Sequence, residues 1–351
     1  MNEGKRLTIS SIGFGVLCGL TATLWAGTGS PDLHRIRAGG RFAYIDHAGR
    51  VVIAAQFEDA APFFDGLAAV KVKGRWGNID QTGKLVVPPR YPEPVHFFEG
   101  LGAINYTKDG CLYHGYVDHK GKEVVPVRPG TGYGFSNGLA VVRSSKQFGY
   151  IDRTGKLALP FSAAWRQAEN FSEGLAAVMI NDLYGFIDKN GRLVIRARFK
   201  PAMTYLTGPH NQEVWDPPKF TERLAAVRLD GKAGFIDAAG RFAIEPRFEA
   251  ALPFSEGLAQ VRVGGKWGFV DRAGKVVIAP RFEKAGPFQE GLASASLGKL
   301  VGFIDPTGGF VIKPAYFGVG RFEAGLVEVS KPDGKFFYID AAGRKVADAP
   351  D

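Results

Sequence analysis

The chain has 351 residues, a formal net charge of +9 and only two cysteines. Cys18 lies in an apolar N-terminal segment, which leaves Cys111 alone and excludes a framework of internal disulfides. The basic residues are interspersed with acidic ones rather than gathered in runs, so the net charge does not by itself indicate a nucleic-acid partner.

Residues 1–26 differ from the rest of the chain. Lys5 and Arg6 precede an uncharged, largely apolar run from Leu7 to Ala26, which is the layout of a secretory signal with a cleavage site at its end. The run also approaches the roughly 20 residues of a spanning helix, so an uncleaved N-terminal membrane anchor is the alternative. We expect residues 27–351 to be exported, as a periplasmic or secreted protein or as a protein anchored to the membrane and facing outside the cytoplasm.

One sequence unit recurs from about Leu33 to the C-terminus. Its most regular mark is an Asp followed three residues later by a Gly, a pattern that favours a type I turn ending in a left-handed glycine. An Ile or Val precedes every one of these Asp residues. We therefore predict one domain, residues 27–351, with nine repeats, whose turns begin at Asp46, Asp80, Asp118, Asp152, Asp188, Asp237, Asp271, Asp305 and Asp340.

The core of the seventh unit is Trp267-Gly-Phe-Val-Asp271, followed by Gly274 and Lys275. This core resembles the WG-repeat (KWG-type) β-repeat family. The Trp-Gly pair is kept at Trp76 and Trp267, and other residues take the Trp position in the other units. The resemblance covers most of the chain and implies an all-β repeat fold. It implies no particular ligand.

The strands of the seventh unit are predicted at 258–263, 267–271 and 275–278, so each unit is expected to be a three-stranded antiparallel meander. The consecutive Val276, Val277 and Ile278 indicate burial on both faces, which stacking between like neighbours would provide. Nine undivided units of three strands favour an open curved array. A closed propeller-like ring, with a short fourth strand supplied by the connector, is the alternative.

Aromatic residues recur in the connectors between units, as at Phe248 and Phe254 and again at Phe282 and Phe288. Because they occupy a fixed place in each repeat, we expect them to fill the gap between neighbouring sheets. A ladder for stacking sugars or bases is the alternative. A basic residue follows eight of the nine turn glycines, and stacking would align these residues into a stripe that the turn Asp residues partly neutralise.

One connector breaks the spacing. The turns at Asp188 and Asp237 are 49 residues apart instead of the usual 34, and the excess lies in the run 200–219. We expect this insertion to leave the stack as a surface loop. Its Tyr205, His210 and Trp215 form the predicted partner-binding site, because insertions in repeat proteins often lie on a binding face.

The sequence offers little chemistry beyond this loop. A single Asp in each turn falls short of the six to eight oxygens that calcium takes, so we expect the Asp residues to cap turns. Cys111, His114, Asp118 and His119 lie close together but fit no zinc motif. No nucleophile elbow, zinc-protease motif or phosphate loop is present. We therefore predict no catalytic residue, no metal site and no cofactor.

Two functions remain. The first is a non-catalytic exported scaffold that mediates protein–protein or cell-envelope interaction, without nucleic acid and with membrane contact only through an uncleaved anchor. The alternative is a carbohydrate- or peptidoglycan-binding protein, or one acting on carbohydrate, that uses surface aromatics and a carboxylate pair. An open groove lined by Trp165 and Trp215 with two facing acids would favour the second function. Aromatics buried between the sheets would favour the first.

Overall fold

The computed structural model describes residues 33–207 and 212–349, with side chains for all of these except residues 204–215. The chain divides into two compact units, Met1–Ser30 and Pro31–Asp351, and every described residue belongs to the second. The regular structure of the described residues is all β-strand, as the sequence predicts. The described part of the chain contains no helix that is long and apolar enough to cross a membrane.

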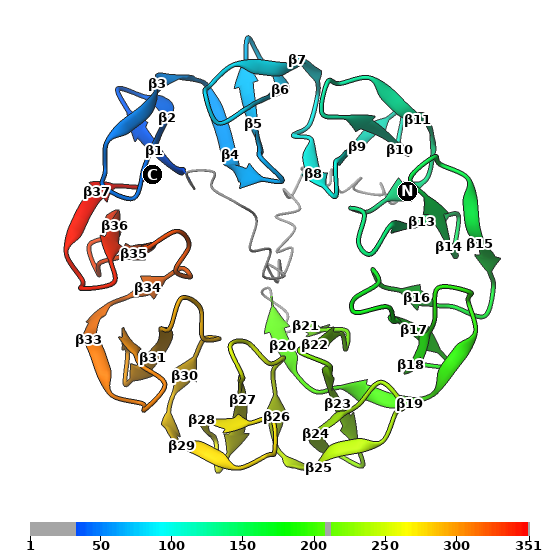
Figure 1. Cartoon of the computed structure of the whole chain (residues 1–351), viewed down its shortest axis with the longest axis vertical. Helices are drawn as coiled ribbons and strands as arrows, with labels where there is room; N and C mark the ends of the chain where they lie inside the picture. Colours follow the sequence, from blue (N-terminus) through cyan, green and yellow to red (C-terminus); the bar gives the residue numbers. More distant parts are fainter. Residues whose placement is uncertain (1–32, 208–211, 350–351) are drawn as a thin grey trace, which may run out of the picture. The chain divides into compact units, whose positions relative to one another are not determined.

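The strands occupy four positions that recur along the chain, from the inner to the outer edge of each sheet (Figure 1). The inner strands are β4 (Asp59–Phe64), β8 (His96–Phe98), β12 (Thr131–Gly132), β16 (Gln167–Ala168), β22 (Phe220–Thr221), β26 (Ala250–Ala251), β30 (Lys284–Ala285) and β34 (Gly318–Val319). The second strands are β1 (His34–Ala38), β5 (Leu67–Val72), β9 (Leu101–Lys108), β13 (Leu139–Ser144), β17 (Ala176–Ile180), β23 (Leu224–Leu229), β27 (Leu258–Val263), β31 (Ala293–Leu297) and β35 (Leu326–Ser330).

The third strands carry the Trp-Gly position and lead into the Asp turn. They are β2 (Arg41–Ile45), β6 (Arg75–Ile79), β10 (Cys111–Asp118), β14 (Gln147–Asp152), β18 (Leu183–Ile187), β24 (Lys232–Ile236), β28 (Lys266–Asp271), β32 (Leu300–Ile304) and β36 (Phe336–Asp340). The outer strands are β3 (Val51–Phe57), β7 (Leu85–Tyr91), β11 (Glu123–Pro129), β15 (Leu157–Ser162), β19 (Leu193–Pro201), β25 (Phe242–Phe248), β29 (Val276–Phe282), β33 (Phe310–Tyr316) and β37 (Lys345–Asp348).

These strands make nine antiparallel sheets, numbered 1 to 9 along the chain. Sheet 1 has the three described strands β1 to β3, and sheets 2, 3, 4, 7, 8 and 9 each have four. Sheets 5 and 6 are joined, because β19 pairs with β18 and its end also pairs with β23. The meander of three strands is confirmed. The connector adds a short inner strand. The sequence analysis considered this strand only as part of the closed-ring alternative.

The Asp turns are built alike. In the seventh, the amide of Gly274 donates to the carbonyl of Asp271 at 2.9 Å, and the Asp271 amide donates to the carbonyl of Lys275 at 3.0 Å. The Asp271 carboxylate accepts from the amides of Ala273 and Lys275 at 3.0 and 2.9 Å. Gly274 has φ +78°, a left-handed conformation that disfavours any residue with a Cβ. The turn-capping role predicted for the Asp residues is confirmed.

The glycine of the Trp-Gly pair lets the outer strand approach closely. A Cβ built on Gly268 would lie 2.5 Å from the carbonyl oxygen of Ile278, on the neighbouring strand β29. The pairing register between β28 and β29 shifts at this same place, between Trp267 and Phe269. The absence of a side chain on this glycine therefore permits the close backbone approach, and a larger residue would push β29 away.

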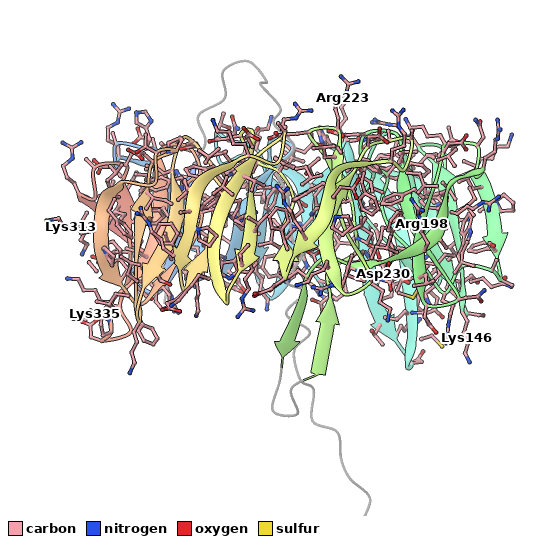
Figure 2. All side chains as sticks on the ribbon, turned by 90° about the horizontal axis from the view of Figure 1, so that it is seen from below. Lys146, Arg198, Arg223, Asp230, Lys313 and Lys335 are labelled. Atoms are coloured by element: carbon pink, nitrogen blue, oxygen red, sulfur yellow. The ribbon has the colours of Figure 1, made fainter. Side chains whose placement is uncertain are left out.

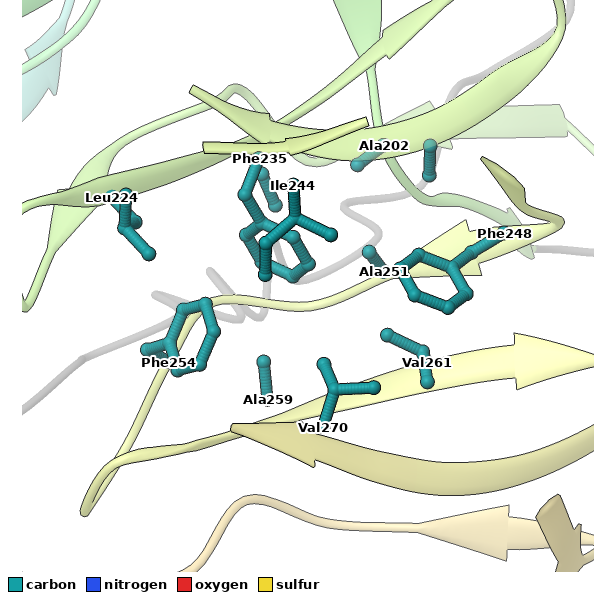
Figure 3. Close-up of a cluster of buried hydrophobic side chains, with 12 residues drawn as sticks. Ala202, Leu224, Phe235, Ile244, Phe248, Ala251, Phe254, Ala259, Val261 and Val270 are labelled. Carbon is teal, nitrogen blue, oxygen red and sulfur yellow. The ribbon is translucent and has the colours of Figure 1, made fainter. Parts of the chain in front are cut away.

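The connector aromatics lie between the sheets. Figure 3 shows Phe254 facing Phe235 of the preceding sheet, and their ring centroids are 4.8 Å apart. Both rings are buried, together with Ile244 and Val270. Six equivalent rings of other connectors are also buried: Phe97, Phe135, Phe171, Phe220, Phe288 and Phe322. Phe63 in the first connector is half-buried against Tyr44. These residues are core, as predicted, and not a stacking ladder.

The outer strands differ from expectation. Val276 and Val277 in β29 are 48% and 43% exposed, whereas Ile278 is buried. The prediction of burial on both faces is therefore wrong for these strands. They form the outer edge of each sheet, so only the side chains directed at the neighbouring sheet are covered.

The last sheet packs against the first. Leu326, Tyr338 and Ala349 form one apolar cluster with Ile36 and Val346. The Tyr338 hydroxyl donates to the Arg35 carbonyl at 3.1 Å, and these two residues lie near opposite ends of the described chain. The nine sheets of this unit thus lie in a ring whose two ends meet, as in the alternative that the sequence left open (Figure 1). Closure uses side-chain packing between sheets 9 and 1 and no shared strand among the described residues.

Candidate functional site

The insertion starts where β19 ends. Lys200 and Pro201 at the end of β19 pair with Arg228 and Val227 of β23. In sheet 7, Ala250 and Ala251 make the equivalent pairs with β27. The end of β19 and β22 therefore share the inner-strand place of sheet 6, and the extra residues leave the sheet between them.

The extra residues form a hairpin, β20 (Thr204–Thr207) and β21 (Gln212–Trp215). The expected surface loop thus contains a paired hairpin, which the sequence did not predict. Figure 2 shows the hairpin extending from the face that carries Lys146, Asp230 and Lys335, away from the face of Arg223. Of the predicted site residues, Tyr205 pairs with Val214 and Trp215 pairs with Thr204 through the backbone. His210 lies outside the described residues.

The chain returns to the repeat frame through Asp216, Pro217, Pro218 and Lys219. Phe220 then takes the usual place of a connector ring, buried against Phe186 with centroids 4.9 Å apart. Pro218 is buried as well. The base of the hairpin is thus fixed by core packing on the side where the chain re-enters the sheet.

A polar network on the neighbouring connector lies at this base. The Tyr184 hydroxyl donates to Gln167 Oε1 at 3.1 Å, and Gln167 Nε2 donates to Glu169 Oε1 at 2.7 Å. The Tyr150 hydroxyl donates to the backbone carbonyl of Glu169 at 2.7 Å. Gln167 and Glu169 flank Ala168, the last residue of β16, so a short strand paired with β17 holds the network in place.

Two carboxyl groups of this region interact electrostatically. Burial raises the pKa of Glu169 to about 7; the Gln167 hydrogen bond opposes the rise, and the charge of Asp216 adds to it. Burial also raises the pKa of Asp216, and Lys219 opposes that shift. A carboxyl group that exchanges its proton near neutral pH can bind a polar ligand in either state, or act as a general acid or base.

Sequence reasoning missed Glu169. Its place in the connector is taken by Ala61, Val95, Leu252 and Gly286 in sheets 2, 3, 7 and 8. Only sheet 4 resembles it, with the polar Tyr133, which is 47% exposed and whose pKa is raised by burial and by the charge of Glu169. An alignment of the connectors by repeat position shows Glu169 as the one acid at this place.

The aromatic groove expected for a carbohydrate site is not formed by Trp165. Its ring is half-buried and packs edge-on against Tyr150, with centroids 6.1 Å apart. The side chain of Trp215 lies outside the described side chains. The described residues therefore bring together an acid pair beside the hairpin without bringing Trp165 onto an open platform.

The cysteine and histidine cluster of the third unit is dispersed. Cys111 is exposed at one end of β10, and His114 is buried in the middle of this strand. His119 lies in the following turn, with its Nε2 3.3 Å from Asp65 Oδ2. No group of three or more His, Cys, Asp and Glu side chains suited to a metal ion occurs among residues 33–207 and 212–349.

The basic residues after the turn glycines stay at the surface. Arg50, Arg241 and Arg344 each bind the Asp of their own turn, at 2.7, 2.9 and 2.7 Å. The partial neutralisation predicted for this stripe is therefore confirmed at these three turns. The stripe is built from turn residues whose charges are already paired in part.

Similarity to solved structures extends over most of the chain. The structure titled "Crystal structure of the eukaryotic initiation factor" is similar at 11% identity, with a TM-score of 0.63 and coverage of 91% of this chain and 95% of that chain. BamB from Moraxella catarrhalis is similar at 12% identity and a TM-score of 0.47, with coverage of 80% and 96%. At such an identity the first similarity shows the fold alone.

No curated protein sequence matches the chain. The model of one family does, in eight successive segments, 42–76, 76–107, 115–145, 148–184, 184–202, 234–267, 267–300 and 302–336. Every segment begins within a third strand, and none covers residues 203–233, which include the inserted hairpin. The chain therefore belongs to the family described as WG containing repeat.

Proposed function

We propose that this protein is a non-catalytic exported scaffold that binds a protein partner or an envelope component through the hairpin β20–β21. The observation that supports it most is that, among the described residues, this hairpin is a pair of strands outside the four recurring strand positions and extends beyond the sheets (Figure 2). Most connector rings of the repeats lie in the core, and the Asp residues cap turns. The signal-like N-terminal residues 1–26 motivate export.

The test is to delete residues 203–217, which restores the six-residue spacing between Phe199 and Phe220. Purified wild-type and shortened proteins are used as baits in a pull-down from a solubilised envelope fraction, followed by site-resolved cross-linking. Lys146→Ala, on the same face as the hairpin, is the matched control. We expect the partner to be lost with the shortened protein and kept with the control. Equal recovery by all three proteins would exclude the hairpin as the site.

The carbohydrate function remains the second candidate, because Glu169 and Asp216 form an interacting acid pair beside Gln167. Carboxylates and amides are the groups that hydrogen-bond sugar hydroxyls, and a carboxyl pair is also what a glycosidase uses. Sedimentation with peptidoglycan and envelope polysaccharides tests this candidate. Binding that is lost in the double variant Glu169→Gln/Asp216→Asn, with the hairpin intact, would favour it over the scaffold.

A further inference from the structure

The turns that join the inner strands to the second strands share an unusual backbone. Each has two successive residues with positive φ, for example Glu290 at +53° and Gly291 at +78°. Successive amides in such turns point toward the same side and form a small concavity that binds anions. Eight of these turns are described: 65–66, 99–100, 137–138, 173–174, 222–223, 256–257, 290–291 and 324–325.

Seven of the eight turns bind a side chain of the preceding turn. The carboxylate of Glu256 accepts from the amides of Glu290 and Gly291, at 2.7 and 2.9 Å. Glu99 accepts in the same way from Asn137 and Gly138, at 2.6 and 2.9 Å. The other five turns receive at least one such bond, from Asp65, Asn137, Glu173, Glu222 and Glu290.

The remaining turn is Asp65–Gly66. Its φ values, +52° and +78°, match those of the other turns, and both residues are exposed. No described side chain accepts a hydrogen bond from either amide. The repeat frame aligns Pro31-Asp32-Leu33 with the Glu-Gly-Leu of other repeats. Pro31 therefore occupies the position whose side chain supplies the carboxylate in those repeats.

No described residue closes the approach to this turn. A Cβ built on Gly66 would meet no atom within 4 Å. The carboxylate of Asp65 is directed to the next turn, where it accepts from the Gly100 amide at 2.5 Å and lies 3.3 Å from His119 Nε2. It therefore does not cover the amides of its own turn.

We infer that the Asp65–Gly66 turn binds the carboxylate of an acidic side chain from a partner protein. Its backbone matches turns that bind carboxylates or a side-chain amide within the ring, which identifies the class of ligand. Hydrogen bonds from two amides to a carboxylate are charge-assisted, but they compete with water at an exposed site. The turn thus contributes one weak, oriented contact within a larger interface. The turn is equivalent to the Glu222–Arg223 turn of sheet 6, and Figure 2 shows Arg223 on the face opposite the hairpin, so the turn adds a second contact surface.

The test is a nitrogen-15 NMR titration of the whole protein with the capped peptide Gly-Glu-Gly. The capped peptide Gly-Gln-Gly is titrated in parallel. We expect saturable shifts of the Asp65 and Gly66 amides with the Glu peptide in the millimolar range. The Gln peptide should bind at least several-fold more weakly. The amides of Glu290 and Gly291, which already hold Glu256, should not move. Absence of shifts at Asp65 and Gly66, or equal shifts at both turns, would overturn the inference.

Two variants sharpen the test. Glu256→Ala removes the internal carboxylate from the Glu290–Gly291 turn, and these two amides should then respond to the Glu peptide as Asp65 and Gly66 do. Pro31→Glu restores the carboxylate at the first position, and it should abolish the response of Asp65 and Gly66. If the Glu256→Ala protein is folded and its Glu290–Gly291 turn ignores the peptide, such turns do not bind an external carboxylate.

Discussion

The boundary between sheets 7 and 8 and the boundary between sheets 5 and 6 are held by the same three kinds of contact. At the regular boundary, Arg281 donates to the Gly308 carbonyl at 2.7 Å and the Ser255 hydroxyl donates to the Phe288 carbonyl at 2.7 Å. The third contact is the Glu256 carboxylate on the next turn.

The boundary with the insertion keeps the equivalents of all three. Arg198 donates to the Gly240 carbonyl at 3.1 Å, and the Ser172 hydroxyl donates to the Phe220 carbonyl at 2.6 Å. The Glu173 carboxylate accepts from the Arg223 amide at 2.8 Å. The hairpin is therefore added to a complete boundary. Residues that recur at the same repeat position hold these sheets together, so function is better sought where the repeat pattern is broken.

A second regular boundary, that between sheets 6 and 7, should lose the most stability when its aromatic ring is removed. Phe254→Ala deletes a buried side chain packed against Phe235, and we expect a loss of about 3–5 kcal/mol in the free energy of unfolding. Val277→Ala, at an exposed position of the same region, should change it by less than about 0.5 kcal/mol. Denaturant unfolding measures both. A small effect of Phe254→Ala would contradict the assignment of these rings to the core.

A turn substitution should have a smaller effect. Gly274→Val places a β-branched residue at φ +78° and brings its Cβ to 3.0 Å from Ile244 Cγ2 of the preceding sheet. We expect a loss of about 1–2 kcal/mol. Since repeat arrays couple mainly to neighbours, hydrogen exchange should rise most in sheets 6 to 8. An equal rise in every sheet would mean that the ring opens as one cooperative unit.

Much of this regular architecture could be predicted from the sequence. The Asp turns, the three long strands and the buried connector rings each repeat a fixed residue type at a fixed position. The inner strands could not be predicted, because they are only two residues long in most sheets and differ in sequence, as in Thr131–Gly132 and Lys284–Ala285. Ring closure depends on small rotations summed over nine sheets, which no local pattern reports.

The candidate site was predicted only in part. The spacing between Asp188 and Asp237 located the insertion, but Glu169 lies some 35 residues before the hairpin, in another connector. It approaches Asp216 only because neighbouring connectors lie side by side in the ring. The pairing of β20 with β21 was also missed, since the run around Pro209 and Pro217 has the composition of a loop.

The acid pair should make the stability of the boundary that carries the insertion depend on pH. The regular boundary should lack this dependence. The folded-state pKa of Glu169 is raised to about 7, above its unfolded value, so the folded protein keeps this proton while the unfolded chain releases it. Stability should therefore fall as pH rises from about 4.5 to about 7. We expect the loss to be on the order of 1 kcal/mol, because the group stays partly in contact with water.

Glu169→Gln should remove this part of the dependence, so that the variant is more stable than wild type above pH 7 and their difference shrinks below pH 5. Melting temperatures of the two proteins across this range measure the effect. Glu283→Gln, at an exposed position between β29 and β30, is the matched control. Parallel curves for wild type and Glu169→Gln would show that burial does not perturb this carboxyl group.

The smallest effect on stability should come from the largest change in sequence. Deleting residues 203–217 removes the hairpin but keeps Phe220, Ser172 and Arg198, whose contacts hold sheets 5 and 6 together. Loop length contributes little to stability, and the deletion also removes the charge of Asp216 beside Glu169. We expect the free energy of unfolding to stay within about 0.5 kcal/mol of wild type, with a reduced pH dependence near neutrality. A loss as large as that of Phe254→Ala would show that the hairpin is part of the ring's core, and its proposed role in binding would then lose its basis.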